Sequence, residues 1–303
     1  MKNKEIKGLY TALVTPFKNG KVDESAYADF VEWQISEGVH GLVPCGTTGE
    51  SPTLSPEEHN RVIELCIEVA KGRVAVMAGT GSNSTEEAID FTRHAEQAGA
   101  DSALLVVPYY NKPTPEGLYQ HFKAIHDATS LPLVLYNIPG RSVVNMSDDL
   151  IARIAELPRV AGVKDATGDL ARVSTLRAKV GNKLALLSGE DMTAVGFNAM
   201  GGVGCISVAS NVAPKLCADV QNASLSGDFK KALQLHEKLM PLHNVMFIET
   251  NPMPVKYAVS RMGYCSEEIR LPLVMPTDAT KKAVDAALAK MGLLSQVKQY
   301  ESA

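Results

Sequence analysis

Residues 133–168, LVLYNIPGRSVVNMSDDLIARIAELPRVAGVKDATG, contain the pattern that decides the fold. The apolar run 133–139 is strand-like, Ser147 is a favoured N-cap residue for the helix that follows, and a second apolar run ends at Lys164. A strand, a helix and a second strand in this order are typical of two parallel strands joined by a crossover helix. The stretch therefore predicts one repeating unit of an α/β protein.

The same alternation of apolar runs and amphipathic helices continues along most of the chain. The expected strands are the runs 11–16, 41–44, 74–78, 102–107, 133–139, 162–164, 184–188 and 203–207. Eight such alternations favour a closed (β/α)8 TIM barrel over an open sheet. We therefore predict an α/β barrel over residues 1–224 and a C-terminal helical extension over residues 225–303. The extension contains two capped amphipathic segments, 226–239 and 277–292.

Composition limits the possible functions. The 303 residues carry a formal charge of -4 with a pI near 6.0, so no basic surface for nucleic acid is expected. The N-terminus has no apolar signal segment and the apolar runs are of strand length, so we expect a cytoplasmic protein without a membrane span. The cysteines form no CxxC pair and the histidines no HExxH pattern, which predicts buried free thiols and no metal site.

Lys164 ends an apolar run and is the first candidate for a catalytic residue. An ammonium group at the end of a buried strand loses hydration, so such a lysine is paired, reaches solvent through its stem, or stays neutral and nucleophilic. Tyr136 has the corresponding place in the preceding strand. If the two strands are parallel neighbours, roughly 4.8 Å apart, the amine and the phenol share one pocket. The alternative is a lysine whose stem covers the core while its head group contacts solvent or Asp165.

Polar residues also follow three other expected strands, on the face of a barrel where active sites lie. The segment 46–51, GTTGES, supplies two threonine hydroxyls and backbone N–H groups that can bind a carboxylate, or it is an ordinary turn. The segment 108–111, PYYN, supplies two phenols, although tyrosine pairs also occur in cores and interfaces. Arg141, after the Tyr136 strand, can hold a carboxylate bidentately or lie on the surface.

Together these groups are suited to carbonyl chemistry. A lysine amine that attacks a ketone forms a Schiff base, whose iminium group lets the neighbouring carbon lose a proton to give an enamine. Phenols and hydroxyls can relay the protons. Neither metal ligands nor a nucleotide motif belong to the set, so no cofactor is expected. The acidic pairs 148–149 and 190–191 are assigned to helix starts, where carboxylates interact favourably with the helix dipole.

Three segments resemble the signature sequences of the dihydrodipicolinate synthase and N-acetylneuraminate lyase family of class I pyruvate aldolases: residues 46–50, 136–141 and 163–168. The likeness covers essentially the whole chain, including its helical C-terminus. In the branch that the chain most resembles, it implies condensation of pyruvate with aspartate-4-semialdehyde in the diaminopimelate route of lysine biosynthesis. It also implies a homotetramer built from two tight dimers.

The resemblance implies four catalytic positions. Lys164 would form the Schiff base with pyruvate, and Tyr136 would move protons to and from it. Thr48 would link Tyr136 to Tyr110, which would reach in from a partner subunit. A monomer would then have an incomplete site.

The resemblance also implies four positions that bind substrate. Thr47 would hold the pyruvate carboxylate and Arg141 the carboxylate of the semialdehyde, while Gly189 and Ile206 would line the pocket. Sialic acid lyases of the family usually lack an arginine after the Pro-Gly turn, so Arg141 favours a small aldehyde that bears a carboxylate. Asp165 stands where the synthases more often have glutamate, which leaves the place of this carboxylate open.

Feedback inhibition by L-lysine is a further implication of the resemblance. The matching positions, which would bind an ammonium and a carboxylate at the tight-dimer interface, are Ser51, His59, Asn83, Glu87 and Tyr109. Pro56 stands where some inhibited members have a histidine. Ser55, Pro56 and Glu87 are also explained as helix-start residues, so plain helix capping remains the alternative.

Two other functions remain compatible with these residues. A sibling aldolase or dehydratase would use the Lys164 enamine on a sugar acid, and Arg141 is the feature against it. A noncatalytic sensor of an amino acid or keto acid would keep the barrel. The four catalytic positions occurring together argue against such a sensor.

Overall fold

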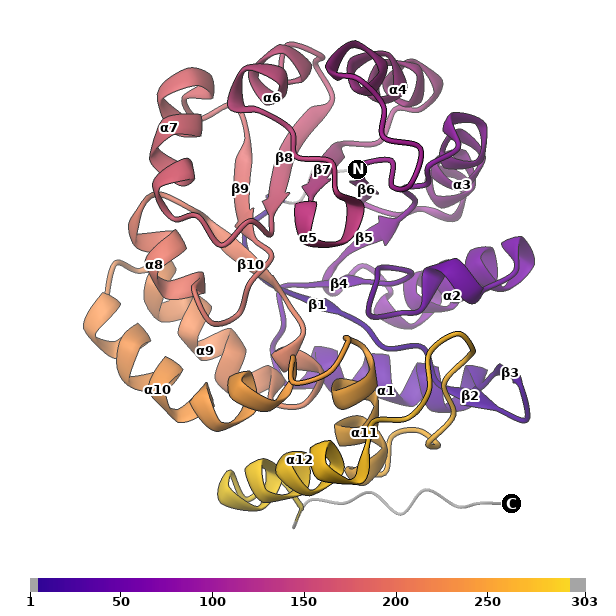
Figure 1. Cartoon of the computed structure of the whole chain (residues 1–303), viewed down its shortest axis with the longest axis vertical. Helices are drawn as coiled ribbons and strands as arrows, with labels where there is room; N and C mark the ends of the chain where they lie inside the picture. Colours follow the sequence, from indigo (N-terminus) through magenta and orange to yellow (C-terminus); the bar gives the residue numbers. More distant parts are fainter. Residues whose placement is uncertain (1–4, 295–303) are drawn as a thin grey trace.

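Eight parallel strands form a closed barrel in the computed structural model, which describes residues 5–294 (Figure 1). Strand β1 pairs with β4 on one side and with β10 on the other, which closes the ring. The predicted (β/α)8 barrel is therefore confirmed. The barrel strands are β1 (Gly8–Ala12), β4 (Gly41–Val43), β5 (Ala75–Gly79), β6 (Ser102–Val106), β7 (Leu133–Asn137), β8 (Val160–Asp165), β9 (Ala185–Ser188) and β10 (Gly204–Ser207).

Amphipathic helices surround the barrel, as the apolar periodicity predicts (Figure 1). Helix α2 (Pro56–Ala70) begins with a capping box, in which Ser55 Oγ accepts from the Glu58 N–H and the Glu58 carboxylate accepts from the Ser55 N–H. The other α-helices up to residue 225 are α1 (Glu24–Ser36), α3 (Thr85–Ala98), α4 (Pro115–Ala128), α5 (Pro139–Ser142), α6 (Asp148–Ile154), α7 (Ala171–Val180), α8 (Ala194–Ala199) and α9 (Pro214–Leu225), and two short 3-10 helices are η1 (Ser51–Thr53) and η2 (Ala209–Asn211).

Side chains alternate along each strand between the barrel interior and the layer under the helices. On β7, Val134 and Tyr136 belong to the interior cluster, whereas Leu133 and Leu135 pack in the outer layer. The interior is filled by buried side chains such as Met77, so the barrel is a packed core rather than a pore. Functional groups therefore lie where the strands end.

Three further helices follow the barrel, α10 (Phe229–Val245), α11 (Met253–Arg261) and α12 (Asp278–Lys290). Helix α10 packs against α9 and α12, and α11 packs against α12 on the side of the barrel where α1 lies (Figure 1). The helices expected at 226–239 and 277–292 are thus present, with α10 longer than expected. The division at residue 224 stays a prediction, and residues 295–303 of the expected extension lie outside the described residues.

The first strand differs from its expected range of 11–16. It begins at Gly8, and beyond Ala12 the chain leaves the sheet because side chains replace the strand partners: the Val14 N–H donates to Asn211 Oδ1 at 3.0 Å. The chain then forms a small antiparallel pair, β2 (Phe17–Lys18) and β3 (Lys21–Val22), that the sequence analysis did not predict. Helix α11 lies within the extension that was predicted to be helical, although no separate helix was delimited there.

Two expectations from composition concern the whole chain. The five cysteines, all within the described part, are buried and free, as predicted. Among residues 5–294, no helix combines the length and the apolar composition that crossing a membrane requires.

Candidate active site

Lys164 and Tyr136 lie side by side at the ends of neighbouring strands. Strands β7 and β8 are parallel, and their register pairs Tyr136 with Lys164. The lysine Nζ lies 4.1 Å from the centroid of the tyrosine ring, and both side chains are buried. The pocket shared by an amine and a phenol, expected from the sequence, is therefore present.

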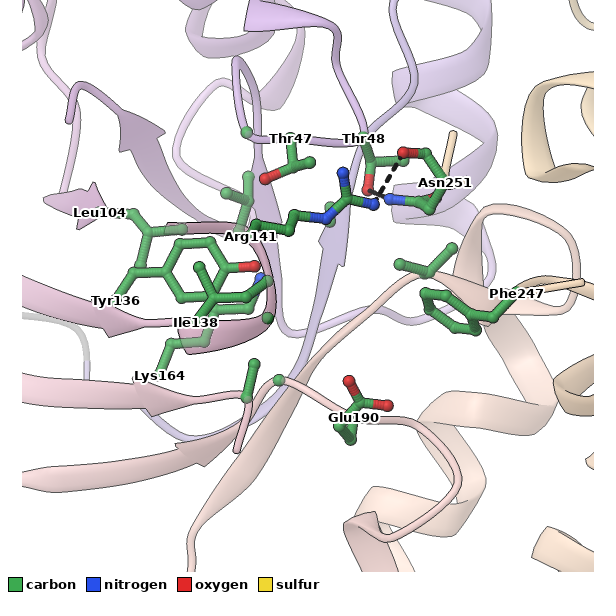
Figure 2. A pocket seen from close by; sticks show the side chains of 17 residues that line it. Thr47, Thr48, Leu104, Tyr136, Ile138, Arg141, Lys164, Glu190, Phe247 and Asn251 are labelled. Atoms are coloured by element: carbon green, nitrogen blue, oxygen red, sulfur yellow. Dashed lines mark hydrogen bonds between the residues drawn. The ribbon is translucent and has the colours of Figure 1, made fainter. Parts of the chain in front are cut away.

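A cavity of about 250 Å³ opens at this end of the barrel. Figure 2 shows the side chains that line it. Six of the predicted positions contribute to its wall: Thr47, Thr48, Tyr136, Arg141, Lys164 and Gly189. The wall also contains Glu190, Phe247 and Asn251, to which the sequence analysis gave no place in the site.

The loop after β4 brings the two threonines to the cavity. It is a compact turn, in which the Gly49 N–H donates to the Gly46 carbonyl at 3.1 Å and the Glu50 N–H donates to the Thr47 carbonyl at 3.2 Å. A Cβ on Gly49 would lie 3.1 Å from the Leu13 carbonyl oxygen, so a larger residue there would have to push this backbone atom aside. The segment is thus a built structure rather than a flexible connection.

Asn251 joins two of the predicted residues. Its Nδ2 donates to Thr48 Oγ1 at 3.1 Å, and its carbonyl oxygen accepts from Arg141 Nη2 at 2.9 Å, as the dashed lines in Figure 2 show. Asn251 lies between α10 and α11, far from both partners in sequence. The Asn-Pro dipeptide at 251–252 indicates a loop between helices, but nothing in it predicts which residues the asparagine contacts.

Glu190 corrects an expectation. The pair 190–191 was assigned to a helix start, but α8 begins only at Ala194, and Glu190 lines the cavity on the side opposite the two threonines (Figure 2). Burial raises the pKa of Glu190, the Asp191 carboxylate raises it further, and Lys164 opposes both. Asp191 instead has a structural role, because its Oδ2 accepts from the Val208 and Ala209 N–H groups at 2.9 Å each.

Three other predicted residues differ in where they lie relative to the cavity. Gly189 fits tightly, since a Cβ there would lie 2.7 Å from the Ala166 Cβ. Ile206 belongs to the apolar barrel interior and does not reach the cavity wall. Tyr110 is 90% exposed, has a positive φ of 70°, and does not line the cavity of its own chain. The structure of one chain thus leaves this phenol on the surface.

Asp165 faces away from the pocket. Its Oδ1 accepts from the Thr167 N–H at 2.9 Å and from the Thr167 hydroxyl at 2.5 Å, and its Oδ2 lies 3.4 Å from Arg172 Nε. Arg172 also forms an ion pair with Asp148 at 3.0 Å. The carboxylate whose place the sequence left open therefore orders the turn after β8 and does not face Lys164.

A second cavity of about 450 Å³ adjoins the first. The two share Thr47, Tyr136 and Arg141 among their lining residues. Of the five positions matched to an inhibitor site, the second cavity is lined by Ser51, Glu87 and Tyr109, with Pro56 beside them.

The other two of those positions lie behind the wall of the second cavity. His59 is buried and stacks on Phe91, with 3.9 Å between ring centroids, and its Nε2 lies 2.9 Å from the Gly79 carbonyl oxygen. Burial lowers the pKa of His59 to about 4. Asn83 donates through Nδ2 to the Tyr109 carbonyl at 3.2 Å, which holds the segment that carries both tyrosines.

The arrangement can support imine chemistry. Lys164 provides an amine in a small cavity, Tyr136 and Thr48 provide hydroxyl groups near it, and Arg141 provides a positive charge. Within residues 5–294 no group of three or more His, Cys, Asp or Glu side chains is placed to hold a metal ion.

The fold and this pocket are those of a (β/α)8-barrel enzyme with a lysine at the end of a barrel strand. The model of the dihydrodipicolinate synthetase family matches residues 5–291, and the chain belongs to this family.

Relatives and solved structures agree with the family. A 4-hydroxy-tetrahydrodipicolinate synthase from Rhodospirillum centenum is 62% identical over 95% of this chain and 99% of its own. The chloride-inhibited dihydrodipicolinate synthase from Acinetobacter baumannii, crystallised with pyruvate, is 47% identical with a TM-score of 0.93, over 95% of this chain and 99% of its own. The enzyme from Cyanidioschyzon merolae, crystallised with lysine bound, is 36% identical with a TM-score of 0.92, over 96% of this chain and 100% of its own.

Proposed function

We propose that the chain condenses pyruvate with L-aspartate-4-semialdehyde, through a Schiff base on Lys164, to give 4-hydroxy-tetrahydrodipicolinate in the cytoplasm. The observation that carries the proposal is the pairing of Lys164 with Tyr136 inside a cavity that Arg141 also lines. The name of the Rhodospirillum centenum relative, which is 62% identical, supports the same reaction.

The chemistry begins when the neutral Lys164 amine attacks the ketone carbon of pyruvate. A C–N bond forms, water leaves, and the imine on protonation becomes an electron sink. The methyl carbon then loses a proton to give an enamine, which attacks the aldehyde carbon of the second substrate. The amino group of that substrate finally displaces Lys164 and closes the ring. Tyr136 lies beside the lysine and is the group we assign to carry these protons.

The other residues of the pocket select the substrates. Thr47 is assigned to the pyruvate carboxylate and Gly189 to the shape of the site, while Ile206 would act on that shape only through the packed barrel interior. Arg141 is assigned to the carboxylate of the semialdehyde, because its guanidinium faces the cavity and Asn251 holds it there. A sugar-acid aldolase would not need this charge, so Arg141 favours the semialdehyde.

Tyr110 and the assembly form one part of the proposal. Thr48 would link Tyr136 to Tyr110 of a second copy of the chain, because the tyrosine of the same chain is exposed and outside the cavity. We therefore propose a homotetramer made of two tight dimers, in which each dimer completes two sites.

L-Lysine is proposed as an inhibitor that binds in the second cavity. Glu87 offers a carboxylate to its ammonium group and Ser51 a hydroxyl, while Tyr109 lines the same space. His59 and Asn83 support this site from behind through Gly79 and Tyr109. Since the cavity shares Tyr136 and Arg141 with the first one, an occupant there would act on the residues of the catalytic pocket.

Borohydride reduction in the presence of pyruvate tests the reaction. Reduction of the imine is expected to add the mass of pyruvic acid less one oxygen atom to a peptide that contains Lys164, and Lys164→Ala is expected to show no adduct. Product formation with aspartate-4-semialdehyde then identifies the acceptor. A folded protein that gives no adduct would contradict the enzymatic proposal and favour a sensor.

A further inference from the structure

Glu50, the last residue of the segment GTTGE, has no part in the chemistry proposed above. It is nevertheless buried, and its Oε1 accepts a hydrogen bond from Lys256 Nζ of helix α11. The side chains of Lys256 and Glu50 are 0% and 1% exposed. The two residues are 206 positions apart in the sequence. The attraction between two charges removed from water offsets their desolvation only when their geometry is good and further hydrogen bonds satisfy them.

The pair is fully connected. The second oxygen of Glu50 accepts from the Arg270 N–H at 3.0 Å. The Phe17 ring lies beneath both basic side chains, 4.0 Å from Lys256 Nζ and 4.2 Å from the Arg270 guanidinium. Arg270 in turn binds both oxygens of Glu58 at 2.6 Å. The charges at this place are therefore matched, and each contact fixes the position of the Glu50 carboxylate.

The conformation of Glu50 shows what the pair holds. Its φ is 56°, in the left-handed region that residues other than glycine seldom adopt. Its N–H donates to the Thr47 carbonyl and closes the turn that presents Thr47 and Thr48 to the cavity. A strained residue at the end of this turn needs an anchor, and the side chain of Lys256 provides one.

Helix α11 and the residues just before it contact the loop at two points. Asn251 donates to the Thr48 hydroxyl at 3.1 Å, and Lys256 donates to Glu50. The Arg141 side chain donates to the backbone carbonyl oxygen of Asn251, and this hydrogen bond does not involve Lys256. A change at Lys256 therefore acts on the threonine loop and leaves the anchor of Arg141 in place.

We propose that Lys256 is a positioning residue, whose buried ion pair with Glu50 sets the place of Thr47 and Thr48 relative to Lys164. The inference rests on the proposed function for its kinetic consequences, but the position of the loop can be measured independently. The competing explanation is a pair that contributes to folding alone.

The double variant Glu50→Gln/Lys256→Met separates the two explanations. Its neutral side chains keep the volume, and the glutamine oxygen still accepts from the Arg270 N–H, so the variant is expected to lose less stability than Lys256→Met alone, which leaves a buried carboxylate without its cation. Since Thr47 and Thr48 lose their fixed place, kcat is expected to fall roughly tenfold to a hundredfold and KM for pyruvate to rise, while KM for the semialdehyde stays within about twofold. Rates are expressed per site that borohydride traps with pyruvate, so an unfolded fraction does not imitate the effect.

Arg261→Met is the matched control. Arg261 lies on the same helix and pairs with Asp285 at 2.8 Å, but both side chains are partly exposed. This variant is expected to keep wild-type kcat and KM. If the double variant does not fold, Glu50→Asp, which shortens the anchor by one methylene and keeps the charges, is expected to lower kcat in the same way.

Amide hydrogen exchange at residues 46–50 is measured in the same proteins. Faster exchange in the double variant, with the control unchanged, is expected. A folded double variant with the same amide exchange at residues 46–50, the same kcat and the same KM as the wild type would overturn the proposal. A wild-type protein that traps no pyruvate would refute the proposed function instead, and the exchange data would still decide whether the pair holds the loop.

Discussion

Two buried lysines of this protein have similar surroundings and different partners. Lys164 is 6% exposed and Lys256 is 0% exposed, and the two amines lie 4.1 and 4.0 Å from an aromatic ring centroid. Lys256 forms an ion pair with Glu50. In the part of the chain that the structure describes, no carboxylate lies within ion-pair distance of Lys164. Burial alone therefore does not distinguish the lysine that we propose to form the Schiff base from one with a fixed role, whereas the partner does.

The difference follows from where each lysine lies. Lys256 comes from a helix packed against the barrel and is surrounded by groups that already satisfy its charge. Lys164 ends a barrel strand at the wall of a cavity, where a substrate rather than a side chain can meet the amine. Removal of Lys164 should therefore affect activity alone, whereas removal of Lys256 should lower stability as well as activity.

Lys164→Ala is expected to have the largest effect, and that effect is on activity. Without the amine no Schiff base forms, so kcat should fall by roughly 10⁴-fold or more. Because no ion pair is broken, the melting temperature should stay within about 3 °C of the wild type. Steady-state kinetics and calorimetry measure the two quantities. A variant that keeps a tenth of the activity, or one that unfolds, would remove the contrast between the lysines.

Lys256→Ala is expected to lower stability in addition to the loss of kcat that follows from its positioning role. The substitution leaves the Glu50 carboxylate buried without its cation, so the free energy of unfolding should fall by about 3–5 kcal/mol. Arg261→Ala, which breaks an exposed pair on the same helix, should cost less than about 1 kcal/mol. Urea unfolding of the two variants provides the comparison. Equal losses would show that the burial of the Lys256 pair has no special consequence.

His59 extends the comparison to a buried base that is stacked on an aromatic ring. Its pKa is about 4 in the folded state against 6.5 for an ordinary histidine. The unfolded chain therefore binds a proton first as pH falls, and the folded state loses stability between pH 6.5 and 4, by about 3 kcal/mol in total. In His59→Gln this part of the pH dependence should disappear. Urea unfolding at pH 7 and pH 4.5 measures the difference in unfolding free energy. If this difference is the same in His59→Gln as in the wild type, His59 is not the group responsible.

The barrel could be predicted because the sequence signals of each strand and helix lie within a short stretch of the chain. Apolar runs and capping residues such as Ser55 act locally, so their pattern survives in the chain as written. The pairing of Tyr136 with Lys164 was predictable for the same reason, since consecutive parallel strands of a barrel are neighbours. The predicted end of the first strand was wrong, because a distant side chain, Asn211, binds the Val14 N–H where the strand was expected to continue.

Contacts between distant segments were not predictable. Asn251 and Lys256 both act on the loop after β4, and nothing in their own segment indicates that partner. Glu190 was assigned to a helix start because an acidic residue before a helix usually has that role, whereas the helix here begins later. The residues that the sequence analysis missed are therefore those whose surroundings come from another part of the chain.

Glu190→Gln is expected to have the smallest effect and tests the cavity itself. Burial raises the pKa of Glu190, so the protonated acid stabilises the fold below pH 4.5, and this contribution is lost as the pH rises and the carboxyl ionises in the folded state. Glutamine mimics the protonated acid, and the melting temperature should therefore rise by about 1–2 °C at pH 8 and stay unchanged at pH 4. Calorimetry at the two pH values gives the result. An equal shift of the melting temperature at pH 4 and pH 8 would mean that packing accounts for the shift, rather than the charge of the ionised Glu190.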